Sequence, residues 1–167
     1  MVSQVASFVE ERRLAMQARL DADKTQAERN QMGQFATPSE LAQEVLQYGI
    51  SKLGEGPRIR FLDPAIGTGS FYSALRRVAG EDRVEVAVGY EVDPHYGEAA
   101  AELWRDTGLL LRLEDFTRAQ PTAEVGGFNL LICNPPYVRH HHMSSDEKVR
   151  LRMCARAACG VEISGLA

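Results

Sequence analysis

Four consecutive residues, Asn134-Pro135-Pro136-Tyr137, bring hydrogen-bond acceptors and an aromatic ring together at the end of an apolar run. The run spans residues 128–133, and the prolines after it predict a buried strand that stops there, because proline lacks the N–H that a sheet requires. Asn134 supplies a side-chain carbonyl and Pro135 a backbone carbonyl, so both can accept from one amino group. Tyr137 adds a flat stacking surface. This set suits a substrate with a planar amide or an aromatic amine.

An acidic residue opens a glycine-containing turn earlier in the chain. Residues 59–62 predict a short strand, and Asp63-Pro64-Ala65-Ile66-Gly67-Thr68-Gly69-Ser70-Phe71 follows it and leads into a helical pattern. A strand, a glycine turn and a helix form the first unit of a nucleotide-binding α/β fold. The Gly-Thr-Gly spacing lacks the third glycine of the dinucleotide fingerprint, and the Asp63 carboxylate would repel a pyrophosphate. The turn therefore favours S-adenosylmethionine, which is cationic and hydroxylated, over NAD or ATP.

Two further acidic residues follow later predicted strands. Glu91 ends the strand predicted over 84–90, at the position where such folds hold ribose hydroxyls. Asp115 and Phe116 follow a third strand, predicted over 109–113, and combine an acceptor for an adenine amino group with a ring that can stack on the base. Each acid alone is typical of a polar loop, but three acids at successive strand ends predict one binding pocket.

The elements that must position these residues are predicted from apolar periodicity and capping signals. Residues 5–30 carry a sparse amphipathic pattern, which predicts one surface helix. This helix could lean on the rest of the chain, contact a partner or be partly disordered, and we favour the first. Thr37 has the position of an N-cap, with Pro38 at the first helical position and Glu40 completing a capping box. A helix is therefore expected from there to about residue 53. A further helix is expected over 94–107.

The strand sequence also predicts a topology. Right-handed crossovers with one reversal beside the first strand give a parallel sheet in which the third strand is outermost, followed by the second, the first and the fourth. The carboxyl ends of all four strands then meet at one edge of the sheet. We expect the ligand site at this edge, with Gly67 close to Asn134.

Composition limits the class of protein and its compartment. The 167 residues are 44% hydrophobic and 25% charged, as in an ordinary globular chain with one core. The net charge of −4 supplies no global positive field, so DNA binding would need a local basic patch or a further segment. No apolar run reaches membrane-spanning length and the polar start is unlike a signal peptide, so we expect a cytoplasmic protein with no membrane partner. Three cysteines without CxxC spacing are expected to be reduced thiols.

The segment after the tetrad is rich in cationic side chains. Three consecutive histidines, 140–142, cannot all face one metal ion, so no metal site is expected there. Ser144 and Glu147 predict a capped helix, and its basic residues are Lys148, Arg150, Arg152 and Arg156. A basic surface beside the tetrad could contact phosphates, and a solvated helix face explains the same charges equally well.

In their order along the chain, these motifs resemble those of bacterial DNA adenine-N6 methyltransferases of restriction-modification type. The resemblance rests on Gly33-Gln34-Phe35-Ala36-Thr37-Pro38, the turn that begins at Asp63, Glu91, Asp115-Phe116 and the Asn134-Pro135-Pro136-Tyr137 tetrad. In that family, an element like 33–38 before the glycine turn marks the arrangement in which the DNA-recognition domain comes last. The resemblance implies an α/β, Rossmann-like S-adenosylmethionine-dependent methyltransferase fold. Residues 1–32 would be an N-terminal helical extension and residues 33–167 a catalytic domain with an incomplete parallel sheet.

The resemblance also implies a role for each site residue. Asn134 and the Pro135 carbonyl would accept from the adenine N6 amine, beside Pro136, and Tyr137 would stack on a base flipped out of double-stranded DNA. The residues that would bind S-adenosylmethionine are Phe35, Thr37, Asp63, Ala65, Gly67, Gly69, Phe71, Glu91, Asp115 and Phe116. This chemistry requires no metal.

Other functions share parts of the pattern. A protein glutamine-N5 methyltransferase also uses Asn-Pro-Pro-Tyr, although the element at 34–38 argues against it, and a cytosine-N4 enzyme more often has serine in place of Asn134. A third alternative is a non-catalytic module that binds a cofactor or a partner. The later strands and the recognition domain of the family are not in this sequence. We therefore expect DNA to be bound through a full-length protein or with a partner chain, and no DNA methylation by the 167 residues alone.

Overall fold

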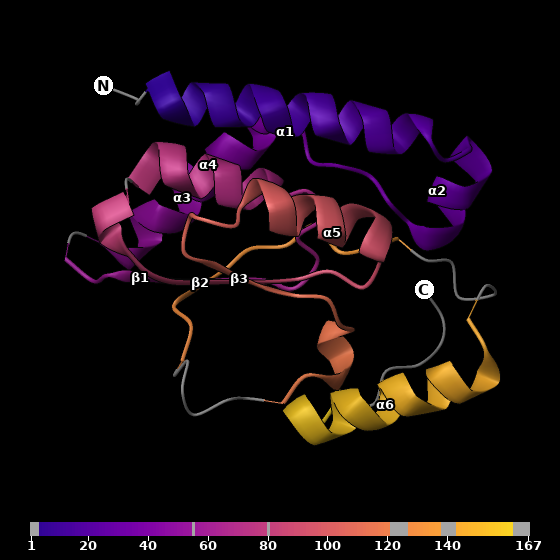
Figure 1. Ribbon diagram of the computed structural model, residues 1–167. Coiled ribbons are helices and arrows are strands. Elements are labelled where there is room, and N and C mark those ends of the chain that lie inside the picture. The colour runs from indigo at the N-terminus through magenta and orange to yellow at the C-terminus, as the bar shows by residue number, and fades with distance from the viewer. Residues whose placement is uncertain (1–3, 55, 80, 121–126, 138–142, 162–167) are drawn as a thin grey trace. The chain divides into compact units, whose positions relative to one another are not determined.

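A computed structural model describes residues 4–54, 56–79, 81–120, 127–137 and 143–161 (Figure 1). The chain divides into two compact units, one made of residues 1–24 and 36–135 and the other of residues 25–35 and 136–167. The helices of the first unit are α1 (Gln4–Ala22), α3 (Ser39–Leu53), α4 (Ser70–Ala79) and α5 (Pro94–Leu103), with 3₁₀ turns η1 (Glu81–Arg83) and η2 (Phe116–Arg118). Its strands are β1 (Ile59–Asp63), β2 (Val84–Tyr90), β3 (Leu109–Arg112) and β4 (Leu130–Leu131). The second unit holds α2 (Gln26–Met32) and α6 (Ser145–Cys159). The expected division of the chain at residue 32 stays a prediction.

The four strands of the first unit form one parallel sheet in the order β3-β2-β1-β4, as predicted. Asp63 at the end of β1 lies opposite Gly89 of β2, and Tyr90 lies opposite Arg112 of β3. The carboxyl ends are therefore aligned at one edge, and the fold is α/β and Rossmann-like. β3 and β4 are shorter than predicted. Among the described strands, β4 pairs with β1, and the backbone bond from Ile132 to Leu62 (3.1 Å) continues this pairing.

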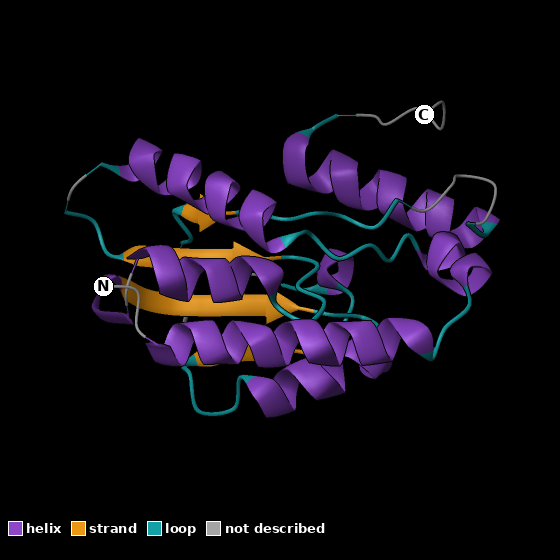
Figure 2. Cartoon of the chain, turned by 90° about the horizontal axis from the view of Figure 1, so that it is seen from above, coloured by secondary structure: helices purple, strands orange, loops and turns teal. Residues whose placement is uncertain are grey.

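The described α-helices of the first unit lie on one side of this sheet, with α1 lying along α4 and α5 as an outer layer (Figure 1). From above, the strands run side by side beneath the helices (Figure 2). α4 lies between the sheet and α1, so its residues from Ser70 to Leu75 are all buried. Phe61, Leu46 and Trp104 are fully enclosed side chains of the core. Burial of such side chains is the main favourable contribution to folding.

The single helix predicted over residues 5–30 is wrong. α1 ends at Ala22, and Thr25 begins α2 with a capping box in which its hydroxyl accepts from the Glu28 N–H and its own N–H donates to the Glu28 carboxylate. α2 ends at Gly33, which adopts a left-handed conformation at φ 64°. The capping signal within the predicted helix therefore prevailed over its apolar periodicity.

The predicted N-cap of the next helix is also wrong. α3 begins at Ser39, Pro38 is its cap residue, and no side chain caps it. The Thr37 hydroxyl instead accepts a hydrogen bond from Asn134 (3.2 Å). A residue with strong local capping propensity is thus recruited by a long-range contact.

The remaining predicted helices are present with different ends. α5 stops at Leu103, before the predicted end at residue 107, and Trp104 is its C-cap residue. Ser144 and Glu147 form the predicted capping box of α6. Histidines 140–142 lie outside the described residues, so the expectation about them stays a prediction. No helix in the described ranges is long and apolar enough to cross a membrane.

Candidate functional site

The glycine turn lies between β1 and α4 and is held from several directions. The Ile66 N–H donates to the Tyr90 carbonyl (2.9 Å), which ties the turn to the end of β2. The Trp104 indole donates to the Thr68 carbonyl (2.9 Å). A Cβ on Gly69 (φ 91°) would lie 2.5 Å from the Trp104 ring nitrogen, so this close packing requires glycine. The turn has one well-defined backbone conformation against which a ligand can bind.

Glu91 reaches this turn from the end of β2. Its carboxylate accepts from the backbone N–H of Gly67 (2.9 Å) and from that of Asp93 (2.8 Å). A Cβ on Gly97 would meet the Leu113 side chain at 2.3 Å and the Glu91 Cγ at 3.2 Å, so glycine at this position of α5 makes room for Glu91. Burial raises the pKa of Glu91. The structure therefore brings Glu91 and the glycine turn together, and the predicted role of Glu91 in cofactor binding stays a prediction.

Asp63 is the most deeply buried acid of the group, with 1% of its surface exposed. One carboxylate oxygen accepts from the Ala65 N–H (3.1 Å), and the other, Oδ2, has no hydrogen-bond partner among the described residues. Burial raises the pKa of Asp63 to about 7, the Ala65 hydrogen bond opposes this, and the nearby charge of Glu91 adds to it. The buried Asp63 and the half-buried Glu91, both with raised pKa values, would be stabilised by a cationic or hydrogen-bond-donating ligand.

The third predicted acid, Asp115, is used locally. Its carboxylate accepts from the N–H and the hydroxyl of Thr117 (2.9 and 2.6 Å) and pairs with Arg118 (3.3 Å), so it caps the short turn η2. Phe116 is 38% exposed and lies edge-on to Tyr90, with ring centroids 5.2 Å apart. Phe116 is thus next to the residue that precedes Glu91. Phe71, in contrast, is buried in the core.

Asn134 follows β4 at the same edge of the sheet. Its amide nitrogen donates to the Thr37 hydroxyl (3.2 Å), and Thr37 itself is 8% exposed. Cys133, the preceding residue, is half-buried, and burial together with the charge of Asp63 raises the pKa of its thiol to about 11. Asn134 is therefore anchored to Thr37, and the neutral thiol of the preceding Cys133 lies near Asp63.

Phe35, Pro136 and Tyr137 belong to the second unit. Gly33, which ends α2, is buried against the backbone of Pro136 and Tyr137: a Cβ there would lie 2.3 Å from the Tyr137 nitrogen. Phe35 is 48% exposed and Tyr137 is 67% exposed. Within this unit, Gly33 therefore contacts the second half of the tetrad.

Several residues that hold the site together were not predicted from the sequence. Glu10 and Arg13 of α1 are buried and bond to the site elements, and Trp104 contacts the glycine turn. Glu10 and Arg13 are charged positions in a helix with few apolar residues, which is typical of a solvated face. Only their departure from a clean amphipathic pattern could have indicated burial.

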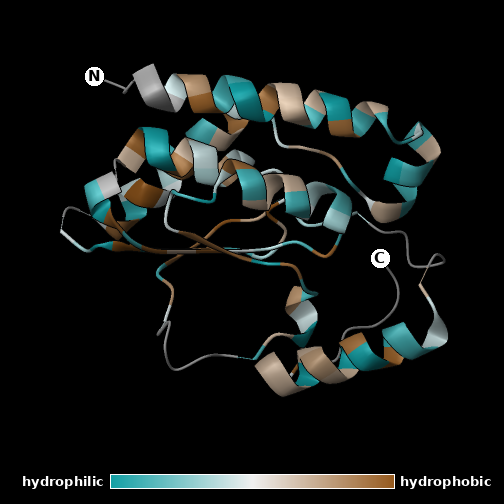
Figure 3. Cartoon of the chain, viewed as in Figure 1, coloured by the Kyte–Doolittle hydropathy of each residue, from teal (hydrophilic) through white to brown (hydrophobic). Residues whose placement is uncertain are grey.

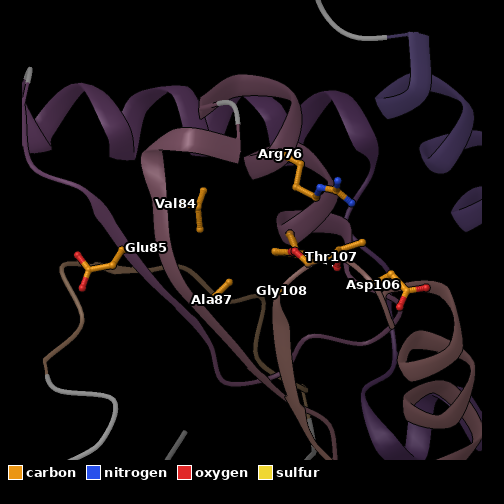
Figure 4. Close-up of a pocket in the computed structure, with 8 residues that line it drawn as sticks. Arg76, Val84, Glu85, Ala87, Asp106, Thr107 and Gly108 are labelled. Atoms are coloured by element: carbon orange, nitrogen blue, oxygen red, sulfur yellow. Dashed lines mark hydrogen bonds between the residues drawn. The ribbon is translucent and has the colours of Figure 1, made fainter.

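A separate cavity of about 310 Å³ lies away from these residues (Figure 4). It is lined at the amino-terminal ends of β2 and β3 by residues that include Val84 and Gly108, with Arg76, Glu85 and Asp106 around it. Ligands of open α/β sheets bind at the carboxyl ends of the strands. The cavity is therefore distinct from the candidate site.

Comparison with known proteins gives one relevant similarity in sequence. No family model matches the chain. The type II methyltransferase M.CvrRI of Paramecium bursaria Chlorella virus XZ-6E is 32% identical over 132 residues, or 76% of this chain. The chain spans 31% of the length of that relative. Most of the chain is thus similar to part of a type II methyltransferase.

Proposed function

We propose that this chain binds S-adenosylmethionine and supplies the catalytic residues with which the protein that contains it transfers the methyl group to the N6 amine of adenine in DNA. The observation that carries this proposal is that one sheet edge holds both a pair of acids, the buried Asp63 and the half-buried Glu91, and the anchored amide of Asn134. The similarity to a type II methyltransferase supports methyl transfer. The choice of adenine rests on the motif resemblance.

The residues present fit this cofactor. The buried Asp63 oxygen without a partner among the described residues suits a positively charged group, because an opposite charge offsets the cost of burying a carboxylate. A carboxylate has about four lone-pair directions, and Glu91 uses three of them for the backbone amides of Gly67, Val92 and Asp93, which leaves capacity for one ribose hydroxyl. Phe116 offers a half-exposed ring for the adenine.

The chemistry needs a better nucleophile than a free adenine amine. S-adenosylmethionine supplies, when bound, an electrophilic methyl group on a positively charged sulfur. The lone pair of the adenine N6 is delocalised into the ring, and hydrogen bonds from this amine to Asn134 and the Pro135 carbonyl favour a pyramidal nitrogen with a localised lone pair. The bond from Asn134 to Thr37 fixes the plane of the amide. Correct placement of the amine then contributes much of the catalysis.

The test is an Asn134→Ala variant of the protein that contains this chain, incubated with duplex DNA and S-adenosylmethionine. We expect methyl transfer to fall about 100-fold or more, because the acceptor that acts on the amine is lost. Cofactor affinity should stay within about two-fold, since no cofactor contact is assigned to Asn134. Mass spectrometry of nucleosides from the digested DNA measures the product, and calorimetry measures cofactor binding.

Asn30→Ala on the exposed surface of α2 is the matched control and should leave both quantities unchanged. Equal losses of transfer and cofactor binding in Asn134→Ala would mean that Asn134 has a structural role. If the unmodified protein produces N4-methylcytosine, the substrate is cytosine and not adenine. If it methylates a glutamine side chain, the substrate is a protein.

A further inference from the structure

A buried ion pair joins two residues of α1 that lie one turn apart. The Arg13 guanidinium donates to both oxygens of Glu10, from Nε to Oε2 (2.8 Å) and from Nη2 to Oε1 (2.7 Å). Glu10 is 6% exposed and Arg13 is 1% exposed. This two-point geometry is the strongest form of the arginine–carboxylate pair, and it holds both side chains in one orientation.

The pair contacts three elements of the first unit besides α1. The hydroxyls of Ser39 in α3 and Ser73 in α4 each donate to Glu10, and Arg13 Nη1 donates to the Thr68 hydroxyl (3.1 Å). Thr68 in turn donates to the Gln17 amide oxygen (2.6 Å), one turn further along α1. Burial alone would raise the pKa of Glu10, but the hydrogen bonds from Arg13 and the two serines hold it at about 2.

These contacts reach both halves of the candidate site. Thr68 lies between Gly67, whose N–H binds Glu91, and Gly69, which packs on Trp104. Trp104 holds the Thr68 carbonyl, so α1 and α5 together fix the residue through its hydroxyl and its carbonyl. Ser39 begins α3 two residues after Thr37, the anchor of Asn134.

Apolar packing would attach α1 at a lower cost in desolvation. A buried ion pair is often no more stabilising than well-packed apolar residues of similar volume, because each charge must leave water. α1 does bury Leu20, but it leaves Phe8 59% exposed, and its residues alternate between polar and apolar along the helix (Figure 3). The ion pair does more than hold α1 on the fold. Its hydrogen bonds fix the positions of particular side chains, one in the glycine turn and two in neighbouring helices.

We propose that Glu10 and Arg13 are positioning residues for the methyl-transfer site, holding the Gly67–Gly69 turn and the start of α3 in the arrangement that binds S-adenosylmethionine. This inference rests on the proposed function. The proposal gives α1 a role in the site, because two residues of α1, Arg13 and Gln17, hydrogen-bond to the Thr68 hydroxyl.

The experiment separates positioning from stability with the double variant Glu10→Leu/Arg13→Met in the full protein. Replacing both partners leaves no unpaired buried charge, although the Ser39 and Ser73 hydroxyls lose their acceptor, so the protein should still fold with a modestly lower unfolding temperature. We expect the Kd for S-adenosylmethionine, measured by calorimetry, to rise at least ten-fold. The matched control is Glu11→Leu/Arg12→Met, the same chemical change at the adjacent exposed positions of α1, which should leave the Kd unchanged.

If the double variant does not fold, Arg13→Lys carries the test. Lysine keeps a positive charge beside Glu10 but lacks the planar fork that reaches Glu10 and Thr68 together, so the Kd should again rise. A folded variant with unchanged cofactor affinity would overturn the positioning role. If the unmodified protein itself fails to bind S-adenosylmethionine, the proposed function fails instead, and the two outcomes are distinct.

Discussion

Glu91 combines a structural contact with the role proposed for it in cofactor binding. Its two oxygens hold the backbone amides of Gly67 and Asp93, which fixes the carboxylate at the mouth of the glycine turn. The same oxygens can accept further bonds, since a carboxylate is an acceptor on both sides of each oxygen. A substitution should therefore preserve shape while removing acceptor capacity, because a truncation would change both.

Glu91→Gln meets this requirement. Glutamine has a single carbonyl oxygen, so it can satisfy only one of the two backbone amides and retains less capacity for a ribose diol. We expect the Kd for S-adenosylmethionine to rise about ten-fold or more, the change that corresponds to the loss of one hydrogen bond to a charged group. Calorimetry measures the Kd.

Glu98→Gln is the control, because Glu98 is exposed on α5 and its substitution removes the same negative charge. If Glu91→Gln and Glu98→Gln bind the cofactor equally well, then Glu91 does not contact the ribose. A loss of affinity in both variants would indicate a long-range effect of net charge.

The end of α2 and the tetrad meet at Gly33. This residue has φ 64° and a backbone so close to Tyr137 that a Cβ would lie 2.3 Å from the Tyr137 nitrogen. Gly33→Ala should therefore lower the free energy of unfolding by about 1–2 kcal/mol, because alanine is strained in the left-handed conformation. The added Cβ should also displace the Tyr137 backbone. We expect methyl transfer to fall at least ten-fold. Thermal unfolding and the transfer rate measure the two effects.

Gly160→Ala isolates the strain. Gly160 ends α6 in the same unit with φ 71°, and nothing lies within 4 Å of a Cβ placed on it. The strain should thus be similar and the transfer rate unchanged. Matching losses of transfer in the two variants would show that the contact with Tyr137 is unimportant.

The strand order could be predicted from the sequence, because it depends on crossover handedness and on alternating strands and helices. Helix ends were harder to predict. Thr37 has every local feature of an N-cap, yet its hydroxyl bonds to Asn134, which is 97 residues away. Local propensity cannot anticipate a partner that only the folded chain brings into reach.

The contribution of α1 to the site could not be predicted for a related reason. Charged residues at Glu10 and Arg13 are typical of a solvated helix face, and a spacing of three also suits a surface ion pair. Their burial depends on hydroxyl groups from three distant segments. The acids at the strand ends, in contrast, followed from topology, and the structure brings Asp63 and Glu91 near the same turn.

For the molecule as a whole, two buried acids should act on stability in opposite directions as pH changes. Glu10 has a pKa lowered to about 2, so its stabilisation is present above its ordinary pKa of 4.5 and is lost as pH falls through about 2. Asp63 has a pKa raised from 3.8 to about 7, so its contribution is greatest below 3.8 and is lost as pH rises through about 7. Of these two groups, only Asp63 changes stability between pH 5 and pH 8.

Asp63→Asn removes this titration and should change the pH dependence of global unfolding. From pH 5 to pH 8, the ligand-free protein should lose roughly 2–3 kcal/mol of unfolding free energy relative to the variant, because the buried carboxyl group must ionise. S-adenosylmethionine should reverse part of this loss, since a positive charge favours the ionised form. Its stabilising effect should therefore be larger at pH 8 than at pH 5, and only in the unmodified protein.

Urea unfolding at several pH values, with and without cofactor, measures both effects. The comparison between proteins matters because the net charge of −4 and the pI near 5.6 also alter stability and solubility as pH changes. Asp82→Asn, a neutralised acid at an exposed position, changes net charge equally and should run parallel to the unmodified protein. If the Asp63→Asn curve is also parallel, then Asp63 is ionised in the folded protein throughout this range. The Asp63 carboxyl group would then carry no proton for a cationic ligand to displace.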